Sequence, residues 1–80
     1  MTLRELDTVV LDRDLPEHGL RRGDLGAVVH TYPGDAVEVE FVRASGRTQA
    51  LVLLQATDVR ALRDADLPAV RTVEAQRGAA

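Results

Sequence analysis

The feature that most constrains the fold is a strict alternation of apolar and acidic residues in AVEVEFV, positions 36–42. Three apolar residues alternate with Glu38 and Glu40, and a period of two places the apolar side chains on one face of a β-strand. We therefore expect a strand over residues 36–42, with Phe41 in the core and both glutamates on the opposite face.

Other segments carry the marks of strands, because they are rich in β-branched residues and lie between turn formers. They are residues 8–12, 26–32 and 48–54, the last of which is a candidate for a buried strand. Turn signals at Pro33-Gly34-Asp35 and at residues 44–47 join the last three of the four strands. The sequence thus predicts a three-stranded meander preceded by one more strand.

Beyond Leu54 the pattern weakens. Thr57 or Asp58 can cap a short turn, a brief strand is expected over residues 59–62, and residues 69–73 could form a further strand. Residues 1–73 are expected to form a single domain. Residues 74–80 have no apolar face and are expected to be a frayed tail.

The length of 80 residues also restricts the architecture. A chain this short buries only roughly 60–65% of its unfolded surface, so its strands must curl around one small core. The expected fold is all-β, a small SH3-like antiparallel barrel of five to six short strands. In such a barrel a long folded-back loop joins the first two strands, and this accounts for the polar stretch Asp12–Arg22.

Within and after this stretch, Gly19, Gly23 and Gly26 are expected to require a positive φ or a close backbone approach. Leu15 and Leu20 have two alternative roles. They can provide an apolar centre for a binding surface, or they can pin the long loop to the core.

The segment from Leu6 to Leu62 resembles a family of short bacterial proteins of unknown function. The similarity lies in DLPEHGL at positions 14–20, GDLGAVV at 23–29, VEF at 39–41 and the final motif Asp58-Val59-Arg60. The resemblance implies an SH3-like barrel and an antitoxin-like or other partner-binding role. A shorter piece, residues 23–28, is similar to the turn of KOW-type barrels, which implies an RNA-associated domain as the alternative.

Composition bears on the partner and the compartment. The chain has no cysteine, which favours a reducing compartment, and no apolar run of the ~20 residues a membrane span needs, so a cytoplasmic location is expected. The formal charge is −3, and there are only one tyrosine and one phenylalanine. Neither a basic field nor a stacking platform is present, which argues against nucleic acid.

Two constellations could suggest chemistry. Asp12, Asp14 and Glu17 lie close to His18, but Pro16 would fall at a ligand position of a calcium loop, and no metal is expected. Ser45 lies in a predicted hairpin turn, where serine is common. We expect neither an enzyme nor a cofactor.

The remaining hypothesis is a non-catalytic protein-binding module, with the Asp12–Arg22 loop and the outer faces of the second and third strands as its surface. Its expected contact residues are polar, aromatic or exposed loop residues, namely Asp14, Leu15, Pro16, Glu17, His18, Arg21, Arg22, Tyr32, Glu38 and Glu40. An open sheet edge would also allow a homodimer.

Overall fold

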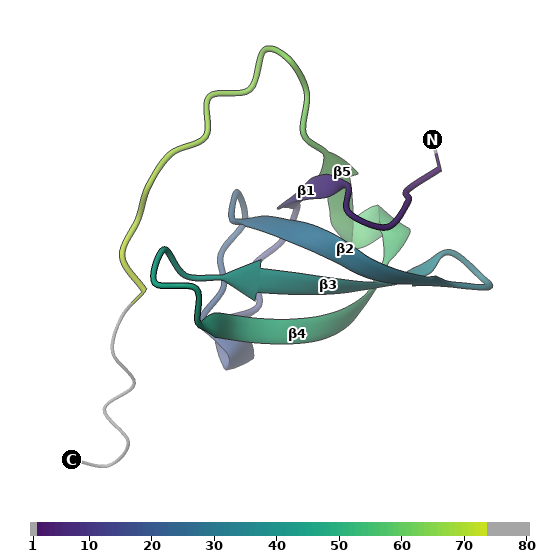
Figure 1. The fold of residues 1–80 in the computed structure, drawn as a ribbon, viewed down its shortest axis with the longest axis horizontal. Helices are drawn as coiled ribbons and strands as arrows, with labels where there is room; N and C mark the ends of the chain where they lie inside the picture. Colours follow the sequence, from purple (N-terminus) through teal and green to yellow (C-terminus); the bar gives the residue numbers. More distant parts are fainter. Residues whose placement is uncertain (1, 74–80) are drawn as a thin grey trace.

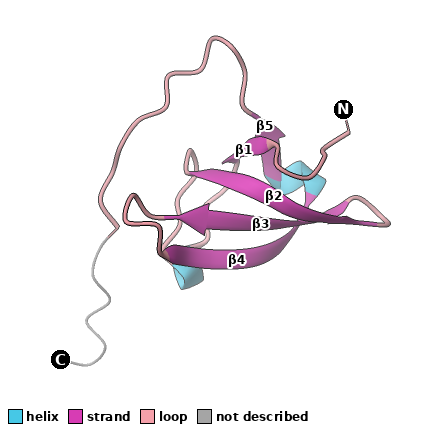
Figure 2. Ribbon diagram, viewed as in Figure 1, coloured by secondary structure: helices cyan, strands magenta, loops and turns pink. Residues whose placement is uncertain are grey.

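The computed structural model of the protein describes residues 2–73. It contains five antiparallel strands in one curved sheet, in the order β4-β3-β2-β1-β5, and two single-turn 3₁₀ helices (Figures 1 and 2). In chain order the elements are β1 (Thr8–Leu11), η1 (Pro16–His18), β2 (Leu25–Tyr32), β3 (Ala36–Val42), β4 (Thr48–Gln55), η2 (Ala56–Asp58) and β5 (Val59–Ala61). The predicted all-β class is confirmed, and β4 and β5 form the two edges of the sheet.

The core lies on the concave side of the sheet. Val37, Val39 and Phe41 are all at most 3% exposed, so the alternation in β3 correctly identifies the buried face. Around them pack the apolar residues of the other strands: Val9, Leu11, Val28, Val52, Leu54 and Val59. Burial of these side chains supplies the main favourable term for folding.

The meander of β2, β3 and β4 forms as predicted. Its first turn contains Gly34 and Asp35, which both have positive φ, a conformation that glycine and aspartate tolerate better than bulkier residues. Asp58, rather than Thr57, caps η2, because its carboxylate accepts the backbone N–H of Gln55 at 3.0 Å.

Gly26 of β2 lies very close to side-chain and backbone atoms of the neighbouring strand β3. A Cβ atom at this position would lie 2.6 Å from Val39 Cγ1 and 3.1 Å from the backbone oxygen of Glu40. The prediction that Gly26 needs a bare backbone is therefore confirmed. Gly19 and Gly23 instead have positive φ, at 68° and 99°.

The long loop between β1 and β2 is folded back against the core. Leu15 and Leu20 form an isolated β-bridge to each other and are each 3% exposed. Of their two alternative roles, pinning the loop to the core is the one that the structure shows. The loop is therefore an architectural part of the domain.

The predicted strand at residues 69–73 is wrong. The chain after β5 is an extended strap, defined as residues 62–73, which arches away from the sheet and returns beside the long loop (Figure 1). Pro68 lacks a backbone N–H donor, and Leu67 and Val70 are almost fully exposed. The backbone N–H of Leu62 still donates to the carbonyl oxygen of Thr8 at 3.1 Å, but beyond it the strap forms no strand ladder and is attached by side chains such as that of Arg71. Residues 74–80, predicted as a frayed tail, lie outside the described part of the chain.

Candidate protein-binding surface

The convex side of the meander carries two rows of side chains that cross three strands. In the first row His30 of β2 pairs with Glu38 of β3, and Glu38 pairs with Leu53 of β4. In the second row Ala27 pairs with Glu40, and Glu40 pairs with Leu51. Directly opposed residues share a face of the sheet. Together with Tyr32, these side chains form what we term the outer face.

Two leucines dominate the β4 side of the outer face. Leu51 is 54% exposed and Leu53 is 63% exposed, whereas Val52 and Leu54 between and beside them are buried. The prediction that residues 48–54 form a buried strand is therefore correct for one face only. The sequence reads as a continuous apolar run, and only the register with β3 shows that its odd-numbered leucines stand beside glutamates.

The two glutamates of the outer face are not neutralised by arginine within residues 2–73. Glu40 accepts a hydrogen bond of 2.6 Å from the hydroxyl of Thr48, which is a neutral group. Several arginines elsewhere are paired with other acids, such as Arg13 with Asp58 and Arg60 with Asp66. The outer face thus combines an apolar strip with uncompensated negative charge.

At the β2 side, His30 and Tyr32 form an edge-to-face ring pair with centroids 4.5 Å apart. Glu5 Oε1 lies 3.5 Å from His30 Nδ1 and so adds another carboxylate beside the pair. Tyr32 is 42% exposed. An exposed aromatic ring that is already held by a neighbour offers contact area at little cost in side-chain entropy.

The predicted contact residues do not form a single surface. Tyr32, Glu38 and Glu40 lie on the outer face, and Tyr32 is at the end of the sheet where β2 turns into β3. The loop residues lie toward the opposite end, where the His18 carbonyl oxygen accepts a hydrogen bond from Gln49 near the start of β4. Leu15 must be removed from the predicted surface because it is buried in the core.

Internal contacts engage the charged loop residues. Asp14 Oδ1 accepts the backbone N–H of Arg22 at 2.8 Å, and the Arg22 guanidinium lies 3.1 Å from Asp12 Oδ1. These contacts hold the loop in its folded-back shape. Pro16 and Glu17 remain exposed on η1. Residues 2–73 contain no group of three or more His, Asp or Glu side chains suited to hold a metal ion.

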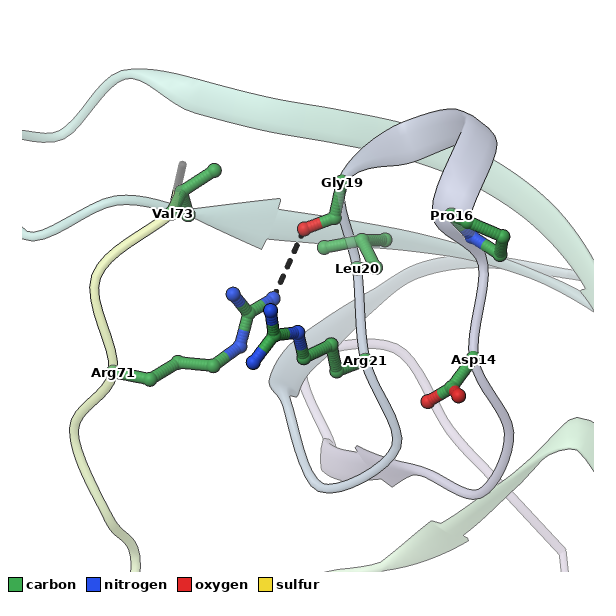
Figure 3. Close-up of a pocket in the computed structure, with 7 residues that line it drawn as sticks. All are labelled: Asp14, Pro16, Gly19, Leu20, Arg21, Arg71 and Val73. Atoms are coloured by element: carbon green, nitrogen blue, oxygen red, sulfur yellow. Dashed lines mark hydrogen bonds between the residues drawn. The ribbon is translucent and has the colours of Figure 1, made fainter. Parts of the chain in front are cut away.

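An open crevice of about 300 Å³ separates the loop from the strap (Figure 3). Asp14, Pro16, Gly19, Leu20 and Arg21 line its loop side, and Arg71 and Val73 line its strap side. The Arg71 guanidinium donates to the carbonyl oxygen of Gly19 at 2.9 Å and to the carboxylate of Asp24. The crevice is therefore held by an internal clasp, and Arg71 is a structural residue that the sequence did not identify.

Asp24 is the acidic half of this clasp. Burial favours its neutral form, but the hydrogen bonds from Arg71 and from the backbone N–H of Arg21 outweigh burial and hold the pKa of Asp24 below its usual value. The carboxylate therefore stays ionised at neutral pH, which is the state that binds the Arg71 guanidinium of the strap.

These features define the class of the protein: a small all-β domain built on a five-stranded antiparallel sheet, with an exposed outer face and a strap across one end. The domain of unknown function DUF4926 matches residues 5–61, and the chain belongs to this family. The match ends at the last residue of β5, before the strap.

No curated protein and no solved structure matches the chain. Neither 3₁₀ helix, nor any other helical segment in residues 2–73, has the length and apolarity to cross a bilayer.

Proposed function

We propose that the protein is a non-catalytic module that binds another protein through its outer face. The observation that carries this proposal is the position of Leu51 and Leu53, both more than half exposed, directly across from Glu40 and Glu38. A domain of this size needs most of its apolar residues for the core. Leucines that are kept outside and grouped on one strand are typical of a contact surface.

The composition of the outer face favours a particular kind of partner. The leucines and the ring of Tyr32 provide apolar contact area, and the glutamates attract a partner with basic groups around an apolar patch. A cationic bacterial protein restrained by a small acidic partner fits this description, which is the antitoxin-like or immunity-like form of the proposal. The absence of cysteine supports a cytoplasmic setting for it.

The internal ion pairs of four of the ten arginines favour protein over RNA as the partner. Arg13, Arg22, Arg60 and Arg71 are ion-paired with carboxylates of the same chain. An RNA-associated domain needs basic side chains that release counterions from phosphates. The outer face presents glutamates instead, and Phe41, the second aromatic residue of the chain, is buried.

The test is photo-crosslinking in the cells that express the protein. A benzophenone amino acid replaces Tyr32 on the outer face, and in a matched control the same amino acid replaces Leu67, which is 93% exposed on the strap. We expect a discrete protein adduct from position 32 that is absent from position 67. Charge reversal of both Glu38 and Glu40 to arginine should abolish that adduct.

Three outcomes would overturn the proposal. The first is the absence of a protein adduct at position 32, and the second is an equal yield of adducts from positions 32 and 67. The third is an adduct that disappears on nuclease treatment, which would make the KOW-like, RNA-associated function the correct one.

A further inference from the structure

We infer that β4 pairs antiparallel with β4 of a second copy of this chain, so that the outer face runs without a break across a dimer. The inference deepens the proposed function and rests on it in one respect, namely that Leu51 and Leu53 are contact residues. The partner proposed for the β4 side of the outer face is a second copy of the same chain.

The inference begins with the exposed edge of β4. This strand is eight residues long, and of the strands in residues 2–73 only β3 pairs with it. Its sequence TQALVLLQ contains no charged residue and no proline. Edge strands of monomeric proteins usually carry a charge, a proline or a covering segment that prevents pairing with another chain. The long loop contacts the start of β4, because Gln49 donates a hydrogen bond of 3.0 Å to the carbonyl oxygen of His18, but residues 50–55 contain neither a charge nor a proline.

The opposite edge of the sheet is protected. β5 is only three residues long, and it contains Arg60, whose guanidinium forms two hydrogen bonds, of 2.8 and 3.1 Å, with the Asp66 carboxylate. This pairing folds the start of the strap beside β5. The contrast between the two edges shows that β4 is the side on which a further strand can be added.

The pattern of β4 is complementary to itself. A two-fold axis at Val52 would place Leu51 of each copy opposite Leu53 of the other, and all four leucines would lie on the same outer face. Each leucine would thereby lose exposed apolar surface to an identical partner. No opposed charges arise, because the nearest acids, Glu38 and Glu40, are on β3 and one strand further from the axis.

A second copy of the chain is a better partner for β4 than an unrelated strand, because the side-chain pattern of β4 is complementary to itself. An extended segment from another protein would also satisfy the backbone groups of the edge, but only β4 itself is certain to present uncharged side chains in the matching alternation. The residue pairing 51 to 53 is thus a specific prediction that a partner of another sequence does not share.

The first experiment measures mass in solution by sedimentation over a dilution series. We expect a reversible monomer–dimer equilibrium for the natural chain. Leu53→Lys should raise the dissociation constant by at least ~10-fold, because it places a charge at the centre of the pairing. Leu67→Lys is the matched control and should leave the equilibrium unchanged, since Leu67 is exposed on the strap.

A second experiment tests the register and uses the absence of cysteine from the chain. An oxidised mixture of Leu51→Cys and Leu53→Cys should give disulfide-linked dimers in higher yield than either variant alone. Circular dichroism checks that the variants remain folded, as expected for positions that are more than half exposed.

A natural chain that stays monomeric at every concentration would overturn the inference. So would a dimer that persists in Leu53→Lys, or equal disulfide yields from mixed and separate variants. The two proposals can be distinguished. If the chain is monomeric but position 32 still forms an adduct with another protein, the dimer is wrong and the binding function stands. If the chain is monomeric and position 32 forms no adduct, both proposals are wrong.

Discussion

The guanidinium of Arg71 forms a two-pronged ion pair with the carboxylate of Asp24, joining residues that are 47 positions apart in the chain. Both side chains are partly buried, at 26% and 18% exposed. The same guanidinium reaches the carbonyl oxygen of Gly19. One side chain thus connects the end of the strap to the long loop and to the turn that precedes β2.

Replacement of Arg71 by alanine should detach the strap. It leaves the Asp24 carboxylate without its strongest donor, and the cost of such a partly buried, unpaired group is about 1–3 kcal/mol of unfolding free energy. Urea denaturation gives this value, and hydrogen exchange over residues 62–73 should show faster exchange of the strap amides.

Arg47→Ala is the matched control, since Arg47 is exposed in the β3–β4 turn and takes part there through its backbone groups. It should leave both measurements unchanged. If Arg71→Ala and Arg47→Ala had the same stability, the clasp would have no structural role.

Acid should lower the stability of the domain because it protonates carboxylates whose pKa is lowered in the folded state. The hydrogen bond from Arg60 and the backbone N–H of Arg63 lower the pKa of Asp66 from 3.8 to about 2. A carboxylate with a lower pKa in the folded state stabilises the fold fully above its unfolded value, and this contribution is lost as the pH falls through the folded value. The Asp66 contribution should therefore disappear between pH 3.8 and about 2.

The measurement is the unfolding free energy of the natural chain and of Asp66→Asn as a function of pH. Their difference should be constant at neutral pH and should shrink across this acid window. A difference that does not depend on pH would contradict the role assigned to the Arg60–Asp66 pair.

Gly26→Val should destabilise the fold by overpacking. A side chain at this position meets Val39, Phe41 and the rigid backbone oxygen of Glu40. Crowding of this kind typically costs about 1–3 kcal/mol. Ala27→Val, which adds bulk on the outer face of the same strand, should have a much smaller effect on the thermal midpoint. Equal midpoints for the two variants would show that the approach at Gly26 is not tight.

Leu15→Ala tests whether the long loop is held by its apolar residues. Leu15 is buried, and truncation of such a leucine costs about 2–5 kcal/mol. Leu67→Ala, at an exposed position, should change the unfolding free energy by no more than ~0.5 kcal/mol. A Leu15→Ala protein as stable as the Leu67→Ala control would mean that the loop is held by its polar contacts alone.

Local patterns predicted much of the fold. The alternation in residues 36–42 identified both the strand and the face that carries Phe41, because a period of two has a direct geometric meaning. Turn residues gave the two hairpins of the meander. Gly26 was correctly identified as a position without room for a side chain, since a glycine inside a strand pattern indicates a close approach.

Long-range relationships could not be predicted in the same way. Residues 69–73 read as a strand, but Arg71 is attached to Asp24 by its side chain, and a contact between distant residues leaves no periodic signal. The outer face depends on the register that puts Leu53 beside Glu38. Leu6 has a φ of 74° although it is not glycine, and no sequence pattern indicates this conformation.

The uncharged edge of β4 also has a consequence for the unfolded chain. Short segments of high β-propensity without charge or proline are those from which ordered aggregates grow, and ALVLL at positions 50–54 is such a segment. In the folded protein, core packing and the ladder with β3 restrain it. The strand to which we assign the dimer pairing is therefore also an aggregation-prone segment whenever the chain is unfolded. A charge at position 53 would lower both the proposed association and aggregation.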